Sequence, residues 1–303
     1  MTTTMTTPTS EAAAESLRGK HGRDGVTSAV FAAVLWLCLA LICVFLFFIL
    51  AVIVQKGVAR LDLNLLTNQP SKIRAETAGV QSALFGTLWV GAITGLIAMP
   101  LGIAAAVYLE EYANPLKWWN RAIELNIQNL AAVPAVIYGI LTLGFVVRGP
   151  VSIGAVVLAG GIALALLILP VVIITTREAL RSVPQEIRDG SLALGATQWQ
   201  TTWRQVLPAA VPGIATGSIL AMSRAIGEAA PLILVGATTF VTFNPDGLLS
   251  RYTTLPVQIF NLVPQDRDAF RDLAYSAILL LIVVLLAMNA VAIWLRNRYQ
   301  RSW

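Results

Sequence analysis

Residues 177–208 read REALRSVPQEIRDGSLALGATQWQTTWRQVLP and lie between two long apolar intervals of the chain. The segment is too long for a simple turn between helices and too amphipathic for a linker. Its leucines and tryptophans supply apolar surface, Gly195 can end one helix, and Pro208 can begin the next. The segment therefore predicts a helix, a turn and a second helix, which either lie on lipid or offer a docking surface to a partner.

The composition of the whole chain indicates that most of it lies in apolar surroundings. Of the 303 residues, 57% are hydrophobic and only 12% are charged, and the mean hydropathy is +0.74. Soluble domains carry about 25% charged residues, so most of this chain has no water to face. The composition indicates a polytopic membrane protein.

Uncharged intervals predict the number of spans, because a spanning helix needs about 20 apolar residues and a charge at mid-bilayer is costly. The sequence does not show the polar–apolar alternation of a membrane barrel. The intervals are 25–55, 77–109, 125–147, 149–176, 205–223 and 273–295, and the fifth continues past Arg224 and Glu228 to residue 245. We therefore expect an all-α fold with six transmembrane helices.

The distribution of basic residues predicts the orientation of these helices. One set of loops, which includes both termini, holds 12 Lys and Arg residues, and the opposite set holds 8. The positive-inside rule then places the N- and C-termini in the cytoplasm of a multi-pass plasma-membrane protein. The net charge of +5 is thus explained by orientation rather than by binding to nucleic acid.

The expected organisation has five parts. Residues at the N-terminus are rich in Thr, Ala, Glu and charge, and cannot bury enough apolar surface to order themselves. The parts are a disordered cytoplasmic tail (1–27), a first transmembrane helix (28–54), an external loop (55–83), a five-helix core (84–296) that contains residues 177–208, and a basic cytoplasmic C-terminus (297–303).

Several kinds of chemistry are excluded by the residues themselves. The single histidine, His21, lies in the polar tail, so a Ser-His-Asp triad, a His-ligated zinc site and a metalloprotease helix are absent. None of the four lysines completes a phosphate-binding loop. We expect a chain that is not an enzyme and binds no cofactor or metal, and any ATP would be used by a partner subunit.

Two charges inside the fifth interval are candidate functional residues. Arg224 and Glu228 are four residues apart, which places them on one face of a helix. Intramembrane charges usually face a bundle interior or a water-filled path. The two residues are either a structural ion pair or an anion site, in which the guanidinium offers a planar fork of donors to phosphate oxygens.

The spacing within residues 177–208 resembles the EAA-xxx-G-x9-I-x-LP loop of ABC importer permeases. Here the triplet is Asp-Gly-Ser and the isoleucine position is Gln205, while the glycine and the Leu-Pro pair are retained. In that family the short helix of the loop sits in a groove of the ATPase subunit. The resemblance implies an ATPase-coupling loop that contains Asp189, Gly190, Ser191, Gly195, Trp199, Leu207 and Pro208.

Further segments resemble one branch of that family, the phosphate importer permeases of the PstA type. The similar segments are NLAAVPAVIYGILTL (129–143), DGSLALGATQWQTTWRQVLPAAVPGI (189–214), SRAIGEAAPLILVGA (223–237) and LPVQIFN (255–261). The resemblance implies a type I permease fold and import of inorganic phosphate by alternating access. It also implies a PstC-type second permease, two copies of a cytoplasmic ATPase, an external phosphate-binding protein and surrounding membrane lipid. Arg224 and Glu228 match residues in the family's translocation region.

Three alternatives remain at the level of sequence. The chain could be a permease for another oxyanion, such as molybdate or sulfate, because the loop does not distinguish these substrates. It could be a membrane scaffold that recruits a partner without transport. An intramembrane enzyme is less well supported, since Glu228 is the only acidic residue within a predicted span.

Overall fold

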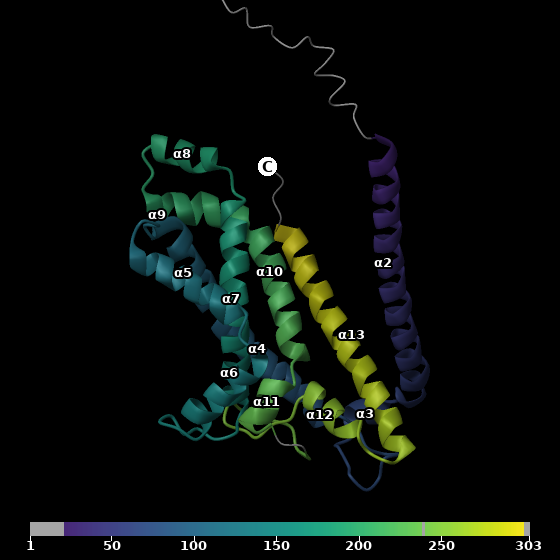
Figure 1. Cartoon of the computed structure of the whole chain (residues 1–303). Helices are drawn as coiled ribbons and strands as arrows, with labels where there is room; N and C mark the ends of the chain where they lie inside the picture. The colour runs from purple at the N-terminus through teal and green to yellow at the C-terminus, as the bar shows by residue number, and fades with distance from the viewer. Residues whose placement is uncertain (1–20, 238–239, 300–303) are drawn as a thin grey trace, which may run out of the picture. The chain divides into compact units, whose positions relative to one another are not determined.

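The structure, a computed structural model, describes residues 21–237 and 240–299, and every regular element in this part of the chain is a helix (Figure 1). The chain divides into two compact units, residues 1–52 and residues 53–303, which are described separately. Five helices in the described part are long and apolar enough to cross a membrane. Six crossings result when the bent pair α5–α6 is counted as one span.

The first unit is formed by most of α2 (His21–Gly57). The large apolar side chains of this helix between Val30 and Leu50 are exposed within the chain, as expected of a helix that is apolar on all sides and faces a membrane. Residues 1–20 of the predicted disordered tail lie outside the described residues. Residues 21–27 of that tail are helical instead, because extending an existing helix adds one hydrogen bond for each residue that is ordered.

The core of the second unit is built on α7 (Val157–Arg181). It packs against α4 (Gln81–Val107) around a cluster that includes Val90, Ile93, Leu164, Ile168 and Val172. α10 (Leu207–Gly227) lies against α7, and α13 (Asp268–Tyr299) packs against α10. This arrangement buries α7 between its neighbours.

The third predicted span is broken into two helices. α5 (Trp118–Ala131) and α6 (Ala135–Thr142), which continues through the π turn η3 (Leu143–Val147), meet at an angle of 104°. The predicted third span over 125–147 is therefore a bent pair of helices rather than one straight helix. Pro134 cannot donate a backbone hydrogen bond and keeps the preceding residue out of the helical conformation.

The fifth predicted span also ends earlier than expected. α10 ends at Gly227, and Glu228 has extended backbone angles of φ −83° and ψ 123°. A short helix, α11 (Ala230–Val235), follows with Pro231 in its first turn. A proline here would clash with the carbonyl of residue 227 in a continuous helix, so the expected continuation to residue 245 does not form.

Shorter helices cover the two ends of the second unit. α8 (Gln185–Ala193) and α9 (Gln198–Thr201) lie at the end of the unit where α7 finishes, whereas α3 (Leu63–Thr67), α11 and α12 (Leu255–Leu262) lie at the opposite end (Figure 1). We call these the α8 end and the α12 end. The remaining turns are η1 (Val58–Arg60), η2 (Tyr108–Tyr112) and η4 (Thr202–Val206).

Because α4 and α7 pack closely, one methyl group added at their contact is expected to lower the stability of the protein. A Cβ atom on Gly161 would lie 2.4 Å from Cγ2 and 2.8 Å from Cβ of the buried Ile93. We expect Gly161→Ala to lower stability by about 1–3 kcal/mol because the core is already filled. Gly144→Ala is the control, since a Cβ there meets nothing within 4 Å. Thermal unfolding in detergent measures both variants, and equal melting temperatures would contradict the close packing.

Candidate functional site

The α8 end carries the helix, turn and helix that the sequence predicts. α8 closes with a glycine turn, in which Gly195 has φ +84° and its N–H donates to the carbonyl of Leu192 at 2.9 Å. The N–H of Ala196 donates to the carbonyl of Ser191 at 3.2 Å, which completes a Schellman motif. Gly195 is therefore needed for its left-handed backbone conformation. We call residues 185–201 the α8–α9 hairpin.

The second helix of the hairpin begins with a capping box. The N–H of Gln200 donates to Oγ1 of Thr197 at 3.3 Å, and the N–H of Thr197 donates to Oε1 of Gln200 at 2.9 Å. The helix then runs without interruption from Gln198 to Gly227. Pro208 lies in the first turn of α10, which follows the π turn η4 and continues the same helix.

The predicted coupling residues fall into two groups in the hairpin. Asp189 and Gly190 are exposed on α8, and Trp199 is exposed on α9, where it stacks on Trp203 with ring centroids 5.3 Å apart. Ser191 and Gly195 instead hold the hairpin together. The hydroxyl of Ser191 lies 2.9 Å from that of Thr201.

The Leu207–Pro208 landmark lies beyond the hairpin. Leu207 is half-buried and packs against the apolar cluster around Leu180 and Val206 at the base of the hairpin. Pro208 is exposed in the first turn of α10. Neither residue therefore belongs to the exposed face of α8.

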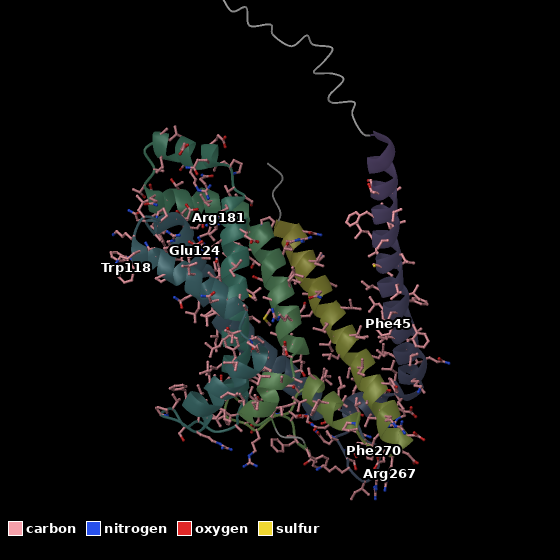
Figure 2. The ribbon with its side chains drawn as sticks, viewed as in Figure 1. Phe45, Trp118, Glu124, Arg181, Arg267 and Phe270 are labelled. Atoms are coloured by element: carbon pink, nitrogen blue, oxygen red, sulfur yellow. The ribbon has the colours of Figure 1, made fainter. Side chains whose placement is uncertain are left out.

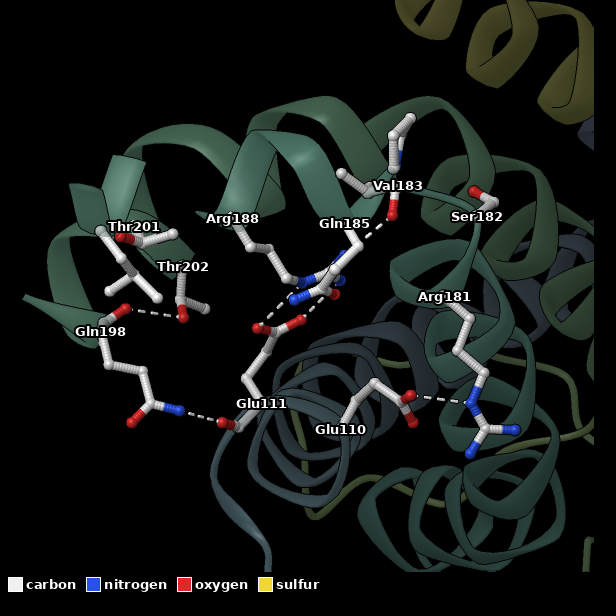
Figure 3. A pocket seen from close by; sticks show the side chains of 12 residues that line it. Glu110, Glu111, Arg181, Ser182, Val183, Gln185, Arg188, Gln198, Thr201 and Thr202 are labelled. Atoms are coloured by element: carbon white, nitrogen blue, oxygen red, sulfur yellow. Dashed lines mark hydrogen bonds and ion pairs between the residues drawn. The ribbon is translucent and has the colours of Figure 1, made fainter. Parts of the chain in front are cut away.

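A cavity of about 630 Å³ lies between the hairpin and the ends of α4 and α7 (Figure 3). Its lining combines charged and neutral polar side chains from these elements. The lining residues are Glu110, Glu111, Arg181, Ser182, Val183, Pro184, Gln185, Arg188, Leu192, Gln198, Thr201 and Thr202.

Glu111 joins the hairpin to the end of α4. Nη2 of Arg188 donates to Oε1 of Glu111 at 2.8 Å, and both side chains are largely buried, with 14% and 8% of their area exposed (Figure 3). The same guanidinium donates to the carbonyls of Val183 and Leu180, each at 2.8 Å. Nε2 of Gln198 donates to the backbone carbonyl of Glu111. Two helices of the hairpin and the last turns of α4 and α7 therefore meet at this pair.

Glu110 makes a separate set of ion pairs with α7. Nε of Arg177 lies 3.1 Å from Oε2 of Glu110, and Nε of Arg181 lies 2.7 Å from Oε1. Glu124 on α5 accepts from Nη1 of Arg177 at 3.0 Å, and Figure 2 shows Glu124 beside Arg181. This set ties α4, α5 and α7 together at the α8 end.

The glutamates and their arginine partners were not predicted as functional residues. In the sequence, Glu110 and Arg177 only mark the limits of apolar intervals. The available indication was an acidic doublet at the end of one span opposite three arginines in residues 177–188. The pairing itself could not be read, because it depends on which helix ends meet.

Arg224 and Glu228 lie apart from this cluster. Arg224 is in the last turn of α10, and Glu228 is the residue that caps the end of this helix, with its N–H donating to the carbonyl of Ala225 at 3.2 Å. Among the described residues, Arg224 has no carboxylate within the 4.0 Å of an ion pair, and its side chain is exposed. The structural ion pair is therefore not formed in this conformation.

The exposed face of α10 continues on both sides of Arg224. Thr216, Leu220, Arg224 and Gly227 are exposed and recur every three or four residues, whereas Ile214, Gly217, Ala221 and Ala225 form the buried face. The arginine thus projects from a side of this membrane-spanning helix that is exposed within the second unit.

Comparison with known proteins identifies the family. Residues 98–303 match the family described as binding-protein-dependent transport system inner membrane component. The chain belongs to this family. It is 33% identical over 285 residues to the probable ABC transporter permease protein YqgI of Bacillus subtilis, with 89% of this chain and 95% of the relative covered.

Phosphate permeases are among its other relatives. The chain is 36% identical over 226 residues to the phosphate transport system permease protein PstA 1 of Mycobacterium tuberculosis, with 72% of this chain and 70% of the relative covered. It is 30% identical over 262 residues to PstA of Haemophilus influenzae, with 86% and 87% covered. The expected relationship to PstA-type permeases is confirmed.

Solved structures establish the fold. A chain of a bacterial ABC transporter for alginate import matches with a TM-score of 0.66 at 18% identity, covering 92% of this chain and 99% of the other. A chain of the MetNI methionine ABC transporter matches with a TM-score of 0.56 at 19% identity, covering 74% and 95%. The all-helical chain has the type I ABC importer permease fold, as expected.

The two arginines that share Glu110 should differ in their contribution to stability. Arg177 is 9% exposed, so Arg177→Ala leaves a largely buried carboxylate without one of its partners and is expected to cost about 3 kcal/mol. The side chain of Arg181 is 54% exposed, and Arg181→Ala is expected to cost less than about 1 kcal/mol. Thermal unfolding of the purified variants in detergent measures the difference, and melting at the same temperature would contradict this ranking.

Proposed function

We propose that this chain is the permease subunit of an ATP-driven importer that moves inorganic phosphate across the plasma membrane by alternating access. The support for phosphate is the similarity to PstA proteins over most of the chain. The α8 end would face the cytoplasm together with both termini, in agreement with the bias of Lys and Arg toward that set of loops. The α12 end would face outward.

The observation that carries the proposed path is the exposed position of Arg224. An arginine on the exposed side of an apolar span is costly against lipid, so this face of α10 must meet water or another protein. A PstC-type second permease covering that face would place the guanidinium beside a path between the two subunits. Its donors are not engaged by an ion pair in the described part of the chain and are therefore open to an anion.

Glu228 would act at the break between α10 and α11. It is half-buried and one residue beyond the helix. A carboxylate there can accept a hydrogen bond from a protonated phosphate oxygen, or hold Arg224 in one closed state of the transporter. Either role keeps the attraction for a passing anion weak enough for release.

The α8–α9 hairpin would dock on one of two copies of a cytoplasmic ATPase. Its exposed surface includes Asp189, Gly190 and Trp199, while Ser191 and Gly195 hold its shape. ATP would be used by that partner, and this chain would contribute no bond chemistry. An external phosphate-binding protein would deliver the anion to the α12 end.

Two other functions are distinguished from this proposal by transport measurements. A permease for sulfate or molybdate would use the same hairpin and the same guanidinium chemistry. A scaffold would recruit the ATPase without moving any anion. Uptake of labelled phosphate, sulfate and molybdate by proteoliposomes that contain the assembled complex separates the three, and a complex that accumulates no phosphate would overturn the proposal.

Substitution of Arg224 tests the path directly. Arg224→Gln removes charge-assisted hydrogen bonds worth about 1.5–3 kcal/mol and is expected to lower phosphate uptake by roughly 10- to 100-fold. Arg298→Gln is the matched control, because Arg298 is exposed in the last turn of α13 and has no part in the proposed path. Normal uptake by an assembled Arg224→Gln complex would remove Arg224 from the pathway.

A further inference from the structure

The ion pair between Arg188 and Glu111 lies away from the exposed surface on which an ATPase would dock. It lies beneath α8, on the side of the hairpin that faces the membrane helices, and its two side chains are 14% and 8% exposed. Among the described residues, it is the one polar side-chain contact between α8 and the helix formed by α4 and η2. Docking residues would instead be expected on the exposed face of α8.

The backbone at Glu111 explains how one helix end serves two partners. Glu110 and Glu111 are adjacent within the π turn η2, yet they contact different elements. Glu110 binds Arg177 and Arg181 of α7, whereas Glu111 binds Arg188 of α8. Because π turns are frequent at functional sites and change the direction of successive side chains, η2 allows this division.

The electrostatics of this helix end favour a permanent contact. The C-terminus of a helix carries partial negative charge, so two glutamates there are unfavourable unless cations lie beside them. Arg188 supplies one cation and also donates to the carbonyls of Leu180 and Val183. Separation of the pair would leave two largely buried charged groups without an opposite charge beside them, which is strongly unfavourable. A displacement of α8 therefore draws the end of α4 with it.

We propose that the Arg188–Glu111 pair is the link that transmits movement of the α8–α9 hairpin to α4. Glu110 joins the same helix end to α7, so α4 and α7 move together, while α10 with Arg224 follows the hairpin directly through α9 and η4. This inference rests on the proposed function, since it assigns to the pair a positioning role in transport. It concerns the efficiency with which ATP hydrolysis is converted into transport, not the binding of ATPase or anion.

The first test measures the number of phosphate ions transported for each ATP hydrolysed by the reconstituted complex. Glu111→Gln keeps the size of the side chain and removes its charge. We expect ATP hydrolysis to stay within about twofold of the wild type, while the ratio of transport to hydrolysis falls by at least about fivefold. Glu76→Gln is the matched control, because Glu76 is exposed between α3 and α4 and makes no ion pair among the described residues.

A double-mutant comparison shows whether Arg188 and Glu111 act together as one link or contribute to transport independently of each other. Arg188→Gln alone is expected to lower the ratio as Glu111→Gln does, and the double variant is expected to be no worse than either single variant. Additive losses would overturn the link. An unchanged ratio of transport to hydrolysis in Glu111→Gln would also overturn the link. If Glu111→Gln and Glu111→Asp both lost assembly, ATP hydrolysis and uptake in proportion, the pair would serve folding alone, and the link would again be overturned.

A second readout does not depend on which anion is transported. Hydrogen exchange is measured on the complex with its ATPase, with and without a trapped nucleotide. Trapping is expected to change exchange in residues 185–193 and 104–112 of the wild type, but only in 185–193 of Glu111→Gln. Equal changes at 104–112 in both proteins, or none in either, would overturn the link. Failure of phosphate uptake in the wild type would overturn only the proposed substrate.

Discussion

The close approach of α4 and α7 is the contact on which the other parts of the core depend, because lipid provides no hydrophobic force to press one apolar helix on another. Such helices associate through dispersion contacts and interhelical hydrogen bonds, and both require small residues at the contact. Gly161 allows Ile93 to approach the backbone of α7, and Oγ1 of Thr94 donates to the carbonyl of Gly161 at 3.3 Å. α10 joins the same helix at Gly217, where a Cβ would lie 2.4 Å from Oγ1 of Thr175.

The charged residues are distributed according to the same membrane constraint. At the α8 end, the carboxylates of Glu110, Glu111 and Glu124 are paired with the guanidinium groups of Arg177, Arg181 and Arg188. This cluster holds four helices without placing a net charge beside them. Arg224 is different, since it lies in a span, is exposed and has no ion pair among the described residues. A second subunit along α10 would resolve this imbalance.

Prolines in the apolar intervals show which features of the helices the sequence alone does not predict. Pro100 and Pro170 lie inside α4 and α7 without ending either helix, whereas Pro134 and Pro231 mark breaks in the predicted third and fifth spans. The residue type and its local cost, about 3 kcal/mol within a helix, are the same in all four cases. The outcome therefore depends on whether the surroundings satisfy the backbone groups that the proline frees, which the residue type alone does not specify.

The sequence by itself determined the membrane class, the apolar crossing segments and the form of the α8–α9 hairpin. These features act locally, since Gly195 and Thr197 shape the chain within one helical turn and an uncharged interval needs no partner. Only the tertiary structure decided that Glu111 pairs with Arg188, and that Arg224 and Glu228 form no ion pair among the described residues. The ion pair joins residues 77 positions apart, and its choice among three arginines depends on how the ends of packed helices are rotated, which no local pattern specifies.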